Sequence, residues 1–154
     1  MACDISIRNS RLFKSPLSIA DIIGKENWVY GTLDDCGRIE VGKNDGSGPL
    51  VIYDPASIGR GVQIENIESK TEILLSLPLP ATENDVRMLY CAAGRIASLW
   101  KSGIVFIDEE KVKVSDLNDC MERDITVNAG LFNTLKESLE EGGITLFCAR
   151  LPIC

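Results

Sequence analysis

Polar and apolar residues alternate over "DISIR" at 4–8, which is the pattern of a β-strand. The following "SPLSIADIIG" predicts a short helix that Ser15 caps, with Pro16 at its first helical position and Gly24 after its end. Four short apolar segments come next, at intervals of about ten residues. They are "NWVYGTL", "GRIEVG", "PLVIYD" and "GVQIENI", separated by turns rich in Gly, Asp and Pro. This spacing predicts an antiparallel β-meander.

The segment "TEILLSLPL" at 71–79 is almost continuously apolar. Such a run predicts a central strand covered on both faces, which Pro78 and the proline at position 80 would end. Between 83 and 101 the apolar residues recur on one arc of a helix, so we expect a long helix facing the core. Thr82 and Asp85 form a capping arrangement at its start.

The remaining pattern predicts a strand at 103–108, a turn at "EEK" and a second strand at 112–116, followed by helices at 116–123 and 128–141 and a last strand at 144–150. This order is typical of a split βαβ, or ferredoxin-like, layer. The predicted fold class is therefore α+β, with an N-terminal antiparallel β-meander packed against a C-terminal ferredoxin-like layer. We expect residues 1–154 to form a single compact unit, with possible halves at 1–70 and 71–154.

Charge narrows the range of partners. The chain has 23 Asp and Glu against 16 Lys and Arg, a net charge of −7 and no basic stripe, so it would be repelled by phosphate backbones and anionic lipid surfaces. We therefore expect neither a nucleic-acid nor a membrane partner. The N-terminal segment lacks an apolar signal region, and no apolar run approaches the roughly 18 residues of a membrane span. These features predict a cytoplasmic protein.

The sequence contains no histidine. Ser-His-Asp and Cys-His catalysis and His-ligated zinc are therefore excluded, and the usual base at neutral pH is missing. The six cysteines include no Cys-x-x-Cys pair, so we expect reduced thiols, no metal and no cofactor. An enzyme would have to use carboxylates, Lys, Tyr or a lone thiolate, and this restriction favours a protein without catalytic activity.

One candidate for thiol chemistry lies on the outer face of the helix predicted at 83–101. Arg87, Cys91 and Arg95 stand at i, i+4 and i+8, opposite the core arc. Two guanidinium groups beside a thiol favour the thiolate and would lower its pKa, which is what a nucleophilic or redox-active cysteine needs. The structural alternative is a solvated helix face that carries one cysteine without a chemical role.

A second candidate is the loop "YDPASIGRGVQIE" at 53–65, where Asp54, Ser57, Gly59, Arg60 and Gly61 form a possible ligand-binding set. The two glycines permit positive φ on both sides of Arg60, so successive N–H groups could form an anion-binding nest beside its guanidinium group. The structural alternative is a tight turn in which Arg60 pairs with Asp54 or another acid.

Acidic pairs or triplets occur at 34–35, 108–110 and 140–141. All of them fall at predicted turns or at a helix end, where carboxylates are expected to be solvated rather than catalytic.

The order "YDPASIGRG", an apolar strand, and "LPLPAT" opening a helix that ends in Trp-Lys resembles small uncharacterised proteins of low-GC Gram-positive bacteria over most of the chain. The resemblance implies a bacterial cytoplasmic protein and specifies no activity. Our leading hypothesis is a non-enzymatic interaction or regulatory module that binds protein partners or itself. The alternatives are an anion or small-ligand binder that uses the Arg60 loop, and a thiol-dependent enzyme or redox sensor that uses Cys91.

Overall fold

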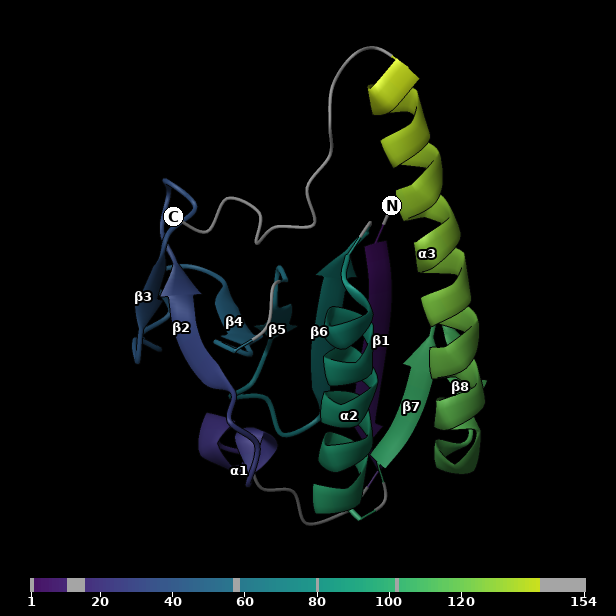
Figure 1. Ribbon diagram of the computed structural model, residues 1–154. Coiled ribbons are helices and arrows are strands. Elements are labelled where there is room, and N and C mark those ends of the chain that lie inside the picture. The colour runs from purple at the N-terminus through teal and green to yellow at the C-terminus, as the bar shows by residue number, and fades with distance from the viewer. Residues whose placement is uncertain (1, 11–15, 57–58, 80, 102, 142–154) are drawn as a thin grey trace.

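A computed structural model describes residues 2–10, 16–56, 59–79, 81–101 and 103–141. Its elements, in chain order, are β1 (Ala2–Asn9), α1 (Ile19–Ile23), β2 (Val29–Leu33), β3 (Ile39–Val41), β4 (Leu50–Tyr53), β5 (Val62–Glu65), β6 (Glu72–Pro78), α2 (Glu83–Leu99), β7 (Gly103–Ile107), β8 (Glu110–Val112), the 3₁₀ turn η1 (Val114–Asp116) and α3 (Leu117–Glu141). Figure 1 shows their arrangement in space.

The eight described strands form one antiparallel sheet in the order β3-β2-β4-β5-β6-β1-β7-β8. Helix α2 lies across β6, β1 and β7, while α1 and α3 pack beside it (Figure 1). The predicted α+β class is confirmed. Strands from both predicted halves of the chain contribute to this sheet.

The predicted ferredoxin-like arrangement of 71–154 is not found. Strand β1 pairs with both β6 and β7 and lies between them, so β8 pairs with the outer edge of β7. The closing strand expected at 144–150 lies outside the described residues. A strand from the first predicted half of the chain thus separates two strands of the second half, β6 and β7.

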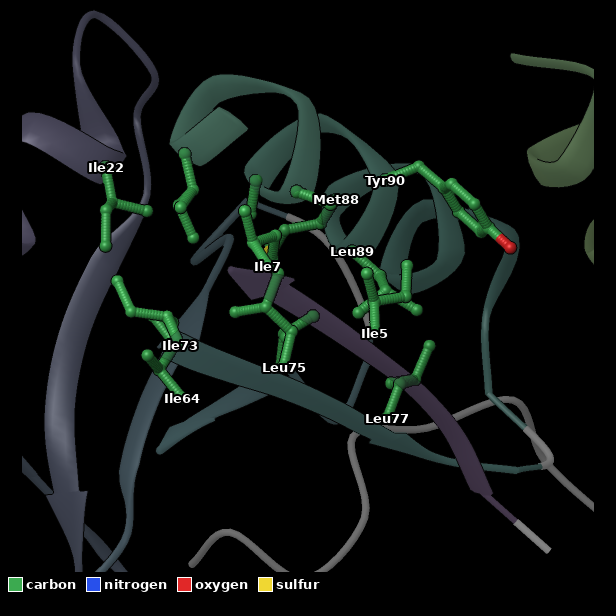
Figure 2. Packing of buried hydrophobic residues seen from close by; sticks show 14 of the residues in the cluster. Ile5, Ile7, Ile22, Ile64, Ile73, Leu75, Leu77, Met88, Leu89 and Tyr90 are labelled. Carbon is green, nitrogen blue, oxygen red and sulfur yellow. The ribbon is translucent and has the colours of Figure 1, made fainter. Parts of the chain in front are cut away.

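The hydrophobic core fills the space between α2 and the sheet (Figure 2). Its strand residues alternate in sequence, because successive side chains of a strand point to opposite faces. In β6, Ile73, Leu75 and Leu77 are fully buried, whereas Leu74 and Ser76 on the opposite face are partly exposed. The prediction that this strand is covered on both faces is therefore wrong, although its central place in the sheet is confirmed.

The first helix begins later than predicted. Ser18, and not Ser15, is the N-cap of α1, and it forms a reciprocal capping box with Asp21. Pro16 consequently precedes the helix, and Ser15 lies outside the described residues. The later start leaves α1 with only five residues.

The two helices predicted at 116–123 and 128–141 form a single helix, α3. Its β-branched Thr126 is tolerated within the helix, where its hydroxyl donates to the carbonyl of Glu122 at 3.1 Å. Asn128 is buried and bonds to both backbone groups of Ala81, accepting from its N–H at 2.8 Å. This contact ties the middle of α3 to the start of α2.

Candidate functional site

The face of the sheet opposite α2 carries a hollow of about 490 Å³ over β6, β1 and β7. We call it the open-face hollow. Strand alternation creates it, since Ile5 and Ile7 point into the core while Asp4, Ser6 and Arg8 point the other way. The lining residues are Asp4, Ser6, Arg8, Glu72, Leu74, Phe106, Asp108 and Glu109.

Arg8 lies across the hollow. It stands opposite Glu72 in the register of β1 and β6, and its Nε donates to Glu72 Oε2 at 2.7 Å. Its Cζ lies 4.2 Å from the centre of the Phe106 ring on β7, which is within the range of a cation–π contact. Arg8 therefore connects all three strands while its side chain remains 53% exposed.

Ser6 lies beside this contact, directly opposite Leu74 on one side and Phe106 on the other. Its hydroxyl oxygen is buried and has no hydrogen-bond partner in the part of the chain that the structure describes. A buried hydroxyl without a partner costs roughly 1–3 kcal/mol, so a group that bonded to it would recover stability. Further along β1, Asp4 accepts a hydrogen bond of 2.7 Å from Ser76.

The rim of the hollow is a strained turn. Asp108 and Glu109 connect β7 to β8 with φ values of 50° and 66°. Hairpin turns with positive φ at both positions usually contain Asn and Gly. Here the same positions carry two carboxylates, and both line the hollow.

Charge in the open-face hollow is unbalanced. Its lining contains four carboxylates and one guanidinium, a formal sum of −3. Lys111, opposite Phe106 in the register of β7 and β8, adds one positive charge nearby on the same face. The lining therefore favours a cationic group, and the aromatic ring of Phe106 favours a planar one.

The structure places the predicted Arg60 loop against the start of α2. The buried carboxylate of Asp85 accepts the backbone N–H groups of Arg60 at 2.9 Å and Gly61 at 3.1 Å. Gly61 has a φ of 78°. Gly59 is needed for space, since a Cβ there would lie 2.4 Å from Asp85 Oδ1.

The N–H groups expected to form an anion nest are thus bonded to the protein's own carboxylate. Asp54 accepts the N–H of Ala56 at 2.9 Å in a local turn. Arg60 Nε is buried without a hydrogen-bond partner among the described residues, and Ser57 lies outside them. An external anion at this loop would have to compete with Asp85.

Arg87, Cys91 and Arg95 lie on the outer face of α2 as predicted, but both arginines have other partners. Arg95 Nη1 donates to the carbonyls of Ile22 at 2.9 Å and Ile23 at 2.6 Å, which holds the end of α1. Arg87 donates to Glu83 at 3.1 Å. Partial burial raises the pKa of Cys91, and Arg95 lowers it by less. The expected lowering of this pKa is therefore not found.

A further cluster joins β1, α2 and α3. Tyr90 and Cys3 both donate hydrogen bonds to Asp124 Oδ2, the thiol at 3.5 Å, and Figure 2 shows the Tyr90 hydroxyl pointing out of the apolar cluster. Burial and the Asp124 carboxylate raise the pKa of Cys3 to about 12. The thiol therefore stays protonated at neutral pH, and the cluster serves to hold α3.

Sequence reasoning missed both the hollow and this cluster. The alternation of "DISIR" contains part of the signal, since it places Asp4, Ser6 and Arg8 on one face. The partners of that face, Glu72 and Phe106, come from strands far along the chain. Only the order of the strands in the sheet shows that Glu72 and Phe106 lie beside Arg8.

Within the described ranges, no group of three or more Cys, Asp or Glu side chains is placed to hold a metal ion. The same ranges contain no helix that is long and apolar enough to cross a membrane.

Residues 2–154 match the family model described as a domain of unknown function, DUF4299, and the chain belongs to this family. No curated protein and no solved structure matches the chain. Family membership covers nearly the whole chain and indicates no specific activity.

Proposed function

We propose that this member of the DUF4299 family is a non-enzymatic interaction module that binds a basic segment of a partner protein in the open-face hollow. The observation that carries the proposal is the lining of that hollow, where four carboxylates surround one aromatic ring and one arginine. Opposite charges across an interface provide specificity and speed association.

The open-face hollow is better suited to binding than to catalysis. Ser6 is the lining residue whose side chain could act as a nucleophile. Among the described residues, however, no base is hydrogen-bonded to its hydroxyl. A serine without such a base is a weak nucleophile. The chain also lacks histidine, the usual base at neutral pH.

The identity of the partner follows from charge. Two copies of a chain with a net charge of −7 would repel each other, so we propose a basic partner in preference to self-association. A segment with alternating basic residues, lying along the exposed face of β6, β1 and β7, would present cations to Glu72, Asp108 and Glu109. The four described cysteines are free thiols, which supports a reducing, cytoplasmic setting as part of the same proposal.

Fluorescence anisotropy with a labelled decapeptide of alternating Arg and Ser tests this function. We expect saturable binding that weakens as salt rises, because the contact depends on exposed charges. Replacing three carboxylates of the hollow, as in Glu72→Gln, Asp108→Asn and Glu109→Gln together, should weaken binding by about tenfold.

A charge-matched control carries Asp35→Asn, Glu68→Gln and Glu137→Gln, three exposed acids outside the hollow. We expect this variant to bind as the unmodified protein does. An equal loss in both triple variants would show a non-specific effect of net charge and contradict the proposal, as would the absence of binding to the unmodified protein.

A further inference from the structure

We infer that Arg8 occupies a guanidinium-binding subsite, in the position that an arginine side chain of the partner would take. The inference rests on the proposed function and narrows it, since it makes arginine, and not lysine, the residue that the open-face hollow selects. The two contacts of Arg8, with the ring of Phe106 and the carboxylate of Glu72, define this subsite.

The geometry of these contacts is specific to a guanidinium group. A planar, delocalised cation can stack on an aromatic ring while its N–H groups bond to a carboxylate at the edge, whereas an ammonium group has neither the plane nor the fork. Arg8 does both, with Cζ at 4.2 Å from the Phe106 ring centre and Nε at 2.7 Å from Glu72. The same two protein groups would therefore accept a guanidinium group from outside.

Arg8 is also placed so that it can be displaced. The side chains of Arg8 and Glu72 are 53% and 40% exposed, and ion pairs that are open to water are weak and exchange readily. Among the described residues, Nε is the one Arg8 donor that has a hydrogen-bond partner. Arg8 therefore occupies the subsite weakly and competes there with a guanidinium group of the ligand.

The subsite contains a hydrogen-bond acceptor that Arg8 does not use, the hydroxyl of Ser6. The buried hydroxyl of Ser6, opposite Phe106 in the register, has no partner in the described chain. A guanidinium group that enters beside the ring, with more freedom than a side chain tethered two residues away, can donate to this oxygen. This extra bond favours the ligand over Arg8.

Removing Arg8 should therefore open the subsite to a small arginine derivative. We would titrate N-acetyl-arginine amide into the full chain and follow the backbone amide resonances of β1, β6 and β7 by NMR. The Arg8→Ala variant should bind the derivative about fivefold more tightly than the unmodified protein, since an exposed ion pair and cation–π contact no longer compete. N-acetyl-lysine amide should gain less.

Two further variants make the result specific. Adding Phe106→Leu to Arg8→Ala keeps an apolar side chain but removes the ring, and it should abolish the gain. Arg87→Ala removes one positive charge from the outer face of α2, where Arg87 pairs with Glu83, and should bind as the unmodified protein does. If Arg8→Ala does not fold, Arg8→Gln serves in its place, because it also removes the guanidinium.

Each outcome decides the matter. The inference is wrong if neither Arg8 variant binds the arginine derivative more tightly than the unmodified protein does. It is also wrong if Arg87→Ala raises the affinity for this derivative as much, or if the affinity for the lysine derivative rises equally. The proposed function still stands in these cases where the basic decapeptide binds. A gain in Arg8→Ala that Phe106→Leu abolishes supports the subsite, even where no peptide binds to the unmodified protein and the proposed function fails.

Discussion

The side chain of Asp85 reaches back to the main chain of Arg60, 25 residues earlier, and its Oδ2 accepts the Arg60 N–H at 2.9 Å. The same carboxylate completes the capping box of α2 by accepting the N–H of Thr82 at 3.3 Å. One buried side chain therefore fixes both the start of α2 and the entry to β5.

Asp85→Ala should be strongly destabilising. It removes a helix cap and leaves the N–H groups of Arg60 and Gly61 without their acceptor, so we expect the free energy of unfolding to fall by about 3 kcal/mol. Urea denaturation followed by circular dichroism measures the change. Glu83→Ala, at an exposed position in the same turn, is the control and should cost about 0.5 kcal/mol. Equal effects would contradict a special role for Asp85.

Gly59→Ala should be destabilising because the added methyl group would clash with Asp85. A Cβ at this position would lie 2.4 Å from Asp85 Oδ1, and the shift needed to relieve the contact should cost about 2 kcal/mol. Gly130→Ala is the matched control, since a Cβ within α3 there would have no neighbour within 4 Å among the described residues. It should raise stability by about 1 kcal/mol through helix propensity. A neutral Gly59→Ala would show that the loop can move away from Asp85.

Glu109→Gly should raise the stability of the fold and weaken the binding of a basic peptide. Glu109 has a φ of 66°, and glycine at that position should relieve about 1 kcal/mol of backbone strain and raise the melting temperature. The loss of a carboxylate from the hollow should weaken binding of the basic decapeptide about threefold. The neighbouring Glu110→Gly also removes a charge but places glycine in β8, so it should lower the melting temperature. A more stable Glu109→Gly that binds as tightly as before would remove Glu109 from the site.

Alkaline pH should destabilise the fold partly through Cys3. Burial and Asp124 raise the pKa of this thiol from 9.0 to about 12, so the folded state keeps a proton that the unfolded state releases. The stabilising contribution is complete below pH 9 and is lost between pH 9 and 12, by up to about 1.4 kcal/mol per pH unit. Urea midpoints measured from pH 7 to 11 should therefore fall less steeply for Cys3→Ala than for the control Cys36→Ala, an exposed cysteine. Parallel curves would refute this assignment.

Features set by neighbouring residues were predictable from the sequence. The cap of α2 by Thr82 and Asp85 depends on a spacing of three residues and was predicted correctly. The strands that end at Gly, Asp and Pro turns were also placed within a few residues, and the α+β class follows from them. Local pattern and turn chemistry carry this information.

Features set by strand pairing were not predictable. The open-face hollow requires β1 to lie between β6 and β7, which brings Arg8 next to Glu72 and Phe106. The alternation of β1 is equally compatible with other neighbours, so no local signal chooses between them. The acceptor for the Arg60 loop was missed for a related reason, because the prediction had already assigned Asp85 to a helix cap.

The central position of β1 also has a consequence for how the chain folds. This strand comes first in the sequence, yet its two neighbours are completed only at Pro78 and Ile107. During synthesis, the backbone N–H and C=O groups of β1 cannot pair until the residues of β6 and β7 have been made. Contacts of such wide sequence separation slow folding, and until they form, the apolar side chains of β1 are exposed in the nascent chain and favour aggregation.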